Sequence, residues 1–208
     1  MAASSSETVL LECAGERGTV RAKYHPPTAG GAVVIWVGGF DGGFDGPAGG
    51  LFPLLATDLG VHGIGVMRVD FCDRLSPGVV EYGVADVQAA KAELASRGVE
   101  RFALVGHSFG GAVMITVAAN DLSIEGVVTL STQSAGTAGA ARIAPRPLLL
   151  IHGLEDQRLP ADCSRHVFNL AGEPKQLVLL EGARHSLRQR ADDVRRIVSE
   201  WLVERFSL

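Results

Sequence analysis

The residues most capable of chemistry are a serine, an acid and a histidine that occur in that order along the chain. Ser108 is the central residue of a Gly-His-Ser-Phe-Gly sequence at residues 106–110, and Asp156 and His185 follow it. A serine hydroxyl is a weak nucleophile at neutral pH, so it needs a base to take its proton, and the base needs an anion to hold its tautomer. The order favours nucleophilic catalysis by Ser108, with His185 as the base and Asp156 as its partner.

The chain on either side of residues 106–110 predicts a strand followed by a helix. An apolar, β-prone run precedes the pentapeptide, and the apolar residues after it are long enough for a helix. A G-x-S-x-G sequence in this context is typical of a nucleophile elbow, a turn so sharp that the serine hydroxyl stands exposed at the end of the sheet. Side chains at Gly106 or Gly110 would collide where the strand and the helix close together. The alternative is a structural turn without a chemical role.

The acid and the base are expected in loops that follow two later strands. Residues 148–151 predict a buried strand, and the loop after it carries Glu155 and Asp156. We assign the acid to Asp156, with Glu155 as the alternative, since the sequence does not set the register of a loop to one residue. Residues 177–180 predict the next strand, and its loop ends in His185.

The other five histidines fit the role of the base less well. His107 lies beside the nucleophile with its side chain expected to point away from it, and His152 is expected to hold the loop that carries Asp156. The remaining three fall in a predicted helix or in early loops: His25, His62 and His166.

A glycine-rich loop after residues 32–37 predicts the donors for a negatively charged oxygen. In the strand–turn–helix arrangement one donor is the backbone N–H after the nucleophile, here Phe109, and the other comes from the loop after the third strand, here Gly39 or Phe40. Glycines let the backbone turn its amides toward a small target. A merely flexible loop is the alternative.

The same loop contains a tandem Gly-Phe-Asp-Gly repeat at residues 39–46. It lacks the Gly-Lys-Ser/Thr ending of a phosphate-binding loop. No further carboxylates follow Asp41 and Asp45 at the spacing of a calcium loop. We expect no metal and no cofactor, and we expect Phe40 and Phe44 to form an apolar wall of the acyl pocket.

These motifs resemble those of the α/β-hydrolase superfamily, especially its compact esterases and dienelactone-hydrolase-like members. The resemblance covers roughly residues 30–205 and implies an α/β fold, with a doubly wound, mostly parallel sheet flanked by helices. Many members have His-Gly where this chain has Val37-Gly38, and dienelactone hydrolases proper use cysteine where this chain has Ser108. The resemblance therefore favours a serine esterase or thioesterase that acts on a small molecule.

Hydrophobic patterning predicts the strands and helices that would position these residues. The expected strands are 8–13, 19–24, 32–37, 64–70, 102–105, 126–130, 148–151 and 177–180, and the expected helices are 51–59, 84–96, 110–120, 161–170 and 192–206. Their alternation implies a parallel sheet with its site at the carboxyl ends of the strands. Residues 131–146 are too few for a helical cap, so we expect an open site without a cap domain.

Length and composition agree with a single domain over residues 1–208, of which 1–7 are expected to be disordered. The chain is 47% hydrophobic, and its short apolar runs are typical of strands buried on both faces. None of them approaches the roughly 18 apolar residues of a membrane span, and the N-terminus does not resemble a secretory signal. A net charge of −4 without a basic cluster argues against a nucleic-acid partner.

The three cysteines are odd in number and widely spaced: Cys13, Cys72 and Cys163. This pattern favours free thiols over a disulfide framework or a zinc site, and it favours a cytoplasmic location. We expect Cys72 to be a packed thiol.

Three arginines lie on or beside the predicted catalytic loops: Arg158, Arg184 and Arg188. They are either solvated charges or contacts for a carboxylate or phosphate on the substrate, which guanidinium geometry suits. Since a fold does not imply an activity, two further alternatives stay open. One is a ligand-binding or interaction protein, and the other is a peptidase, lyase or perhydrolase that uses the same three residues.

Overall fold

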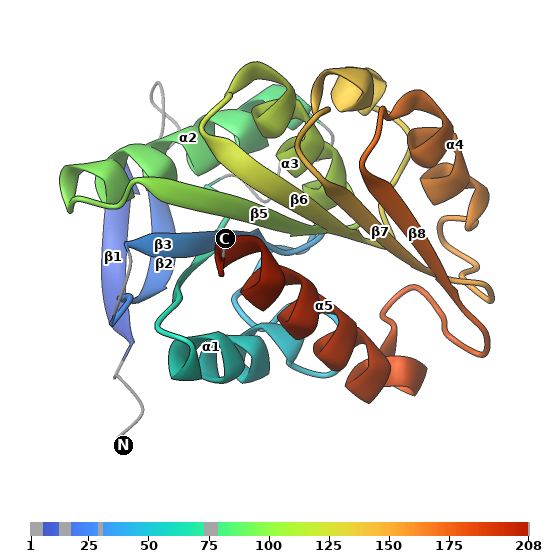
Figure 1. Cartoon of the computed structure of the whole chain (residues 1–208), viewed down its shortest axis with the longest axis horizontal. Helices are drawn as coiled ribbons and strands as arrows, with labels where there is room; N and C mark the ends of the chain where they lie inside the picture. Colours follow the sequence, from blue (N-terminus) through green and yellow to red (C-terminus); the bar gives the residue numbers. More distant parts are fainter. Residues whose placement is uncertain (1–5, 13–17, 29–30, 73–78, 208) are drawn as a thin grey trace.

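One eight-stranded sheet with helices on both faces forms the core of the structure (Figure 1). The computed structural model describes residues 6–12, 18–28, 31–72 and 79–207. The strands are β1 (Glu7–Glu12), β2 (Thr19–His25), β3 (Ala32–Val37), β4 (Gly65–Asp70), β5 (Arg101–His107), β6 (Ile124–Leu130), β7 (Leu148–Gly153) and β8 (Lys175–Leu180). The α-helices are α1 (Leu51–Val61), α2 (Val80–Ser96), α3 (Phe109–Asn120), α4 (Asp162–Leu170) and α5 (Ala191–Phe206), and the 3-10 helices are η1 (Ala138–Arg142) and η2 (Arg188–Arg190).

The strand order is β1-β2-β4-β3-β5-β6-β7-β8. β2 pairs antiparallel with both β1 and β4, whereas all neighbours from β4 to β8 run parallel. The chain moves outward from β3 in both directions, which is the doubly wound topology expected from the sequence. The predicted fold class is therefore confirmed.

Two apolar layers explain why the central strands are buried at every position. All six residues of β3, β4 and β7 are buried, because each strand has helices above and below it. One layer joins the sheet to α2, α3 and α4, and the other joins it to α1 and α5, as the two sides of the sheet in Figure 1 show. The result is a rigid sheet whose parallel strands β3, β5, β6, β7 and β8 all end at one edge.

Some elements extend further than the apolar runs that predict them. β5 continues through Gly106 and His107, which pair with Val37 and Leu130 of the adjacent strands, and such pairing needs only backbone groups. Helix α2 begins at Val80, four residues before its predicted start. Glu7 begins β1 and pairs with Tyr24, so the expected disorder does not reach residue 7, while residues 1–5 lie outside the described residues.

The expectation for Cys72 is wrong, because this residue is disulfide-bonded. Cys163 is a free thiol, and Cys13 lies outside the described residues. The cysteines therefore do not indicate a reducing compartment.

The segment between β6 and β7 contains only the short helix η1, so the fold has no cap domain at the position where larger relatives would insert one. Within the described ranges, none of the helices is both long enough and apolar enough to cross a membrane.

Candidate active site

Ser108 occupies a strained turn between β5 and α3. Its backbone has φ 55° and ψ −118°, a conformation that residues other than glycine seldom adopt. Backbone hydrogen bonds hold the turn: Ser108 N–H donates to the carbonyl of Leu130 on β6 at 2.8 Å, and Gly111 N–H donates to the carbonyl of Ser108 at 3.0 Å. Strain of this kind persists where the surrounding structure enforces it, and it is common at functional sites.

The two glycines of the pentapeptide are required by close backbone contacts. A Cβ on Gly106 would collide with the carbonyl oxygen of Gly110, and a Cβ on Gly110 would collide with the carbonyl oxygen of Gly38. Strand β5, helix α3 and the glycine-rich loop after β3 therefore approach one another closely around Ser108.

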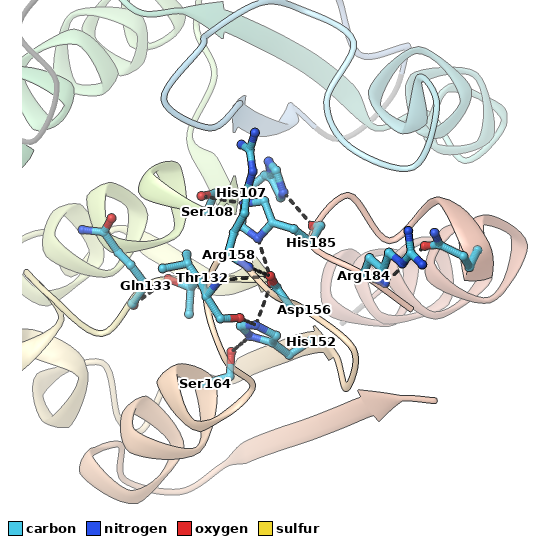
Figure 2. Close-up of polar contacts among 12 residues, drawn as sticks. His107, Ser108, Thr132, Gln133, His152, Asp156, Arg158, Ser164, Arg184 and His185 are labelled. Atoms are coloured by element: carbon cyan, nitrogen blue, oxygen red, sulfur yellow. Dashed lines mark hydrogen bonds and ion pairs between the residues drawn. The ribbon is translucent and has the colours of Figure 1, made fainter. Parts of the chain in front are cut away.

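Ser108, His185 and Asp156 form a hydrogen-bonded chain (Figure 2). The Nε2 atom of His185 lies 3.1 Å from the hydroxyl oxygen of Ser108, and its Nδ1 lies 2.7 Å from Oδ2 of Asp156. Since the carboxylate can only accept, Nδ1 carries the proton, and the lone pair of Nε2 faces the serine hydroxyl. This is the tautomer that a general base for Ser108 requires.

Asp156 is buried and saturated with hydrogen bonds. Its Oδ1 accepts from the backbone N–H groups of Arg158 and Leu159 at 2.9 Å and 3.0 Å. Burial by itself would raise the pKa of Asp156, but the hydrogen bonds from Leu159 and His185 hold the pKa below its usual value. The neighbouring Glu155 is exposed, so the structure places Asp156 rather than Glu155 against His185.

His152 lies behind Asp156 and contacts it directly. Its Nε2 lies 3.2 Å from Oδ2 of Asp156 and 3.0 Å from the carbonyl of Leu159, and its Nδ1 lies 2.7 Å from the hydroxyl of Ser164 on α4. The sequence suggested a role for His152 in holding this loop, from its place at the end of a strand. The sequence does not predict the contact of His152 with the carboxylate of Asp156 or its contact with Ser164 on α4.

His107 connects the serine turn to the histidine loop. Its Nε2–H donates to the carbonyl of His185 at 3.2 Å, and the two rings lie 5.0 Å apart. Burial lowers the pKa of His107 to about 4, so the ring is neutral at neutral pH. From the sequence we expected the His107 side chain to point away from Ser108. This expectation is wrong, because the side chain lines the same cavity as Ser108.

The glycine-rich loop packs directly on the serine. A Cβ on Gly39 would lie 3.2 Å from Nδ1 of His107 and 3.3 Å from Cβ of Ser108. Within the described part of the chain, no backbone carbonyl accepts a hydrogen bond from the N–H of Gly39, Phe40 or Phe109. All three candidate donors are therefore uncommitted to the backbone, and the choice between Gly39 and Phe40 stays open.

Strand β4 anchors the second half of this loop. Oδ1 of Asp70 accepts from the N–H of Gly43 at 2.7 Å, and Oδ2 accepts from Arg21 at 2.6 Å. Arg68 donates to the carbonyl of Phe44 at 3.2 Å. The sequence alone does not single out Asp70 or Arg68, because residues 64–70 have the pattern of an ordinary buried strand.

A cavity of about 150 Å³ opens beside the serine hydroxyl. Its lining comes from the glycine-rich loop, the serine turn and the loops that follow β7 and β8: Gly38, Gly39, Phe40, Asp41, Gly42, Gly46, His107, Ser108, Arg158 and His185. Phe40 is 45% exposed and makes an edge contact with Phe109, with ring centres 6.5 Å apart. A half-exposed aromatic wall of this kind suits a small apolar group.

Phe44 does not share that wall, so the expectation for this residue is wrong. Its ring lies beneath the ammonium group of Lys23, 4.9 Å from the ring centre, on the β2 side of the loop. The bond from Gly43 to Asp70 holds the start of the second repeat on β4, and Phe44 packs on β2, whereas Gly46 lines the cavity.

The three arginines take different positions. Arg158 lines the cavity, and its side chain makes no hydrogen bond or ion pair with any described residue. Figure 2 shows Arg158 extending past Ser108 and His185, with Arg184 pointing away from them. Arg188 is exposed, and neither Arg184 nor Arg188 lines the cavity.

Among the residues that the structure describes, no three His, Cys, Asp or Glu side chains form a group that could hold a metal ion.

Solved structures share this fold at low sequence identity. The esterase domain of a Rhodothermus marinus protein matches with a TM-score of 0.77 and 21% identity, over 96% of this chain and 98% of that one. Dienelactone hydrolase from Anabaena variabilis gives 0.81 and 17% over 98% and 99%, respectively. XC6422 from Xanthomonas campestris, described as a serine hydrolase without a lid, gives 0.72 and 18% over 96% and 94%. These likenesses establish the fold.

Sequence comparison gives a curated relative and a family. The uncharacterized protein YfhR of Escherichia coli is 30% identical over an alignment of 109 residues that covers 41% of this chain. The match spans only 38% of the length of YfhR. The model of the alpha/beta hydrolase family matches residues 81–191, more than half of the 208 residues and the part that contains Ser108, Asp156 and His185. The chain belongs to the alpha/beta hydrolase family.

Proposed function

We propose that this protein is a serine hydrolase that cleaves carboxylic esters or thioesters of small molecules. The observation that supports it best is the hydrogen-bonded chain from Ser108 through His185 to Asp156, with distances of 3.1 Å and 2.7 Å. The three side chains come from different loops, and this arrangement gives a serine hydroxyl both a base and an orienting anion.

In this mechanism Ser108 Oγ attacks the acyl carbon while His185 Nε2 takes the hydroxyl proton. His185 then returns the proton to the leaving alcohol or thiol, and Asp156 stabilises the imidazolium that forms in between. The oxyanion is stabilised by the N–H of Phe109 and by that of Gly39 or Phe40. Water, activated by His185, hydrolyses the acyl-enzyme and restores the serine. No step needs a cofactor.

The cavity narrows the proposed substrate class. A volume of about 150 Å³ suits a short acyl or alcohol group, with Phe40 as the apolar wall. Arg158 brings a guanidinium without a partner among the described residues to the same cavity. We include Arg158 in the proposed binding site as a contact for a carboxylate or phosphate on the substrate, and we withdraw Arg184 and Arg188 from it.

A fluorophosphonate probe tests the proposal, because it phosphonylates an activated serine irrespective of the natural substrate. The wild-type protein should be labelled, whereas Ser108→Ala should not, and His185→Gln should be labelled far more slowly. On a short-chain ester and a short-chain thioester, either substitution should lower turnover by about 10⁴- to 10⁶-fold. A wild-type chain that folds but resists the probe would sink the proposal. One acylation event without turnover would favour a ligand receptor instead.

The single domain and the cytoplasmic location stay predictions. The cysteines do not support the cytoplasmic location, since Cys72 is disulfide-bonded.

A further inference from the structure

His152 is a buried histidine to which the proposed reaction gives no step. Its side chain has no exposed surface, and it lies between the carboxylate of Asp156 and helix α4. Three polar groups lie within hydrogen-bond distance of its two ring nitrogens: Asp156 Oδ2 and the Leu159 carbonyl face Nε2, and the Ser164 hydroxyl faces Nδ1 (Figure 2).

These neighbours determine the tautomer of the His152 ring. The carboxylate of Asp156 and the carbonyl of Leu159 can only accept hydrogen bonds, so Nε2 must carry the proton. A neutral ring then has its lone pair on Nδ1, where the hydroxyl of Ser164 donates. Burial lowers the pKa of His152, which keeps the ring neutral as this arrangement requires. Ser164 is itself completely buried, so its hydroxyl is not diverted by solvent.

The carboxylate of Asp156 is consequently held on both of its edges. Oδ1 accepts from the backbone of Arg158 and Leu159, while Oδ2 accepts from His185 at 2.7 Å and from His152 at 3.2 Å. His152 also fixes the carbonyl of Leu159, a residue whose N–H holds Oδ1. The plane of the carboxylate cannot turn without breaking several of these bonds.

We propose that His152, oriented by Ser164, is a positioning residue that fixes the carboxylate of Asp156 and takes part of its negative charge. The inference rests on the proposed function of Ser108, His185 and Asp156. A carboxylate that receives a second N–H is a weaker partner for the imidazolium of His185. The hold of Asp156 on His185 is therefore weaker than it would be if His152 made no contact with the carboxylate.

The titratable side chains that influence Asp156 or His152 electrostatically are histidines on neighbouring strands and loops. His107 lies on β5, His152 on β7 and His185 on the loop after β8. Among the described residues, only His152 and His185 donate to the carboxylate with their side chains, so removing His152 isolates one of two contributions.

Four variants of the full chain test the inference: His152→Leu, His152→Gln, Ser164→Ala and, as a control, His166→Gln. The last changes an exposed histidine of α4 that has no contact with the site. The readout is the rate constant for inactivation by the fluorophosphonate probe between pH 5 and 9, together with kcat/KM for p-nitrophenyl acetate. Circular dichroism and melting temperature report the fold separately.

His152→Leu should lower the inactivation rate by about 10- to 100-fold, the effect of losing a hydrogen bond to a charged group. It should also move the acid limb of the pH profile upward by roughly half a unit or more. His152→Gln places an amide N–H near the position of Nε2, so it should restore most of the rate and the profile. Ser164→Ala removes the hydroxyl that orients the ring, so the Nε2–H is aimed less well at the carboxylate, and this variant should fall between the wild type and His152→Leu.

The inference is overturned if the acid limb of folded His152→Leu coincides with that of His166→Gln, or if His152→Gln is as impaired as His152→Leu. If His152→Leu does not fold, Ser164→Ala decides, and an unshifted profile in that variant rejects the inference. A wild-type chain that the probe does not label contradicts the proposed function itself, which distinguishes the two failures.

Discussion

The ring of His107 is hydrogen-bonded to the backbone of His185: the Nε2–H of His107 donates to the carbonyl of His185 at 3.2 Å. The residue that precedes the proposed nucleophile thus holds the loop that carries the proposed base. Protonation of His107 is unfavourable in the folded protein, because burial disfavours the charged form of its ring.

The free energy of unfolding should depend on the titration of His107. Burial lowers its pKa from 6.5 to about 4, so between these values the unfolded chain binds a proton that the folded protein does not. Acidification across this window therefore favours unfolding, and it costs on the order of 2 kcal/mol at pH 4.5. His107→Gln, which cannot titrate, should lose less stability than the wild type between pH 7 and pH 4.5 in urea unfolding. The exposed His166→Gln serves as the control, and equal losses in all three proteins would contradict the prediction.

Gly39→Ala should impair turnover with little effect on the fold. The new Cβ would lie 3.2 Å from His107 Nδ1 and 3.3 Å from Ser108 Cβ, so the glycine-rich loop must shift away from the serine. Displacing one oxyanion donor should lower kcat by about 10- to 100-fold or more, with a smaller change in KM. Gly60→Ala in α1 is the control, since a Cβ there meets no atom within 4 Å and a helical alanine stabilises by roughly 0.5–1 kcal/mol. Equal kcat values for both variants would refute the role of Gly39.

Arg158→Ala should discriminate between charged and neutral substrates. Loss of a guanidinium contact should cost an anionic ester about 1.5–3 kcal/mol more than its neutral analogue, measured as kcat/KM. Arg184→Ala and Arg188→Ala are the matched controls, because neither side chain lines the cavity. If Arg158→Ala affects both esters equally, Arg158 is a solvated charge.

Hydrolysis should show no activation at a lipid–water interface. The chain between β6 and β7 contains only η1, so no cap covers the serine and none has to open. The rate on a long-chain ester should therefore rise smoothly through its micellar limit, in an assay that varies substrate concentration across that limit. A sharp increase above the limit would show that some other segment acts as a lid.

The sequence predicts best the features that are local to one strand and its following loop. Ser108, Asp156 and His185 each follow a recognisable apolar strand, and parallel strands bring the loops at their carboxyl ends to one edge of the sheet. The steric role of Gly106 and Gly110 is also predictable, since it depends only on a strand–turn–helix unit.

Contacts between distant parts of the chain are not predictable in the same way. Phe44 repeats the sequence context of Phe40, yet the bond between Gly43 and Asp70 carries it to the opposite side of the loop. The pairing of His152 with Ser164 depends on how α4 packs on β7, which the amphipathic pattern of α4 leaves open to several residues. The sequence indicates that Phe44 lies in the glycine-rich loop and His152 at the end of a strand, but it does not indicate the partner of either residue.

The bonds of Asp70 connect the outermost region of the sheet to the catalytic end. Arg21 belongs to the antiparallel pair of β1 and β2, neither of which contributes a residue to the cavity lining. It is nevertheless two hydrogen bonds from the glycine-rich loop, through the carboxylate that also holds Gly43. Replacing Arg21 in this peripheral pair of strands should therefore disturb the geometry of a distant loop, whereas replacing the exposed Leu10, which lies opposite Arg21 on β1, should not.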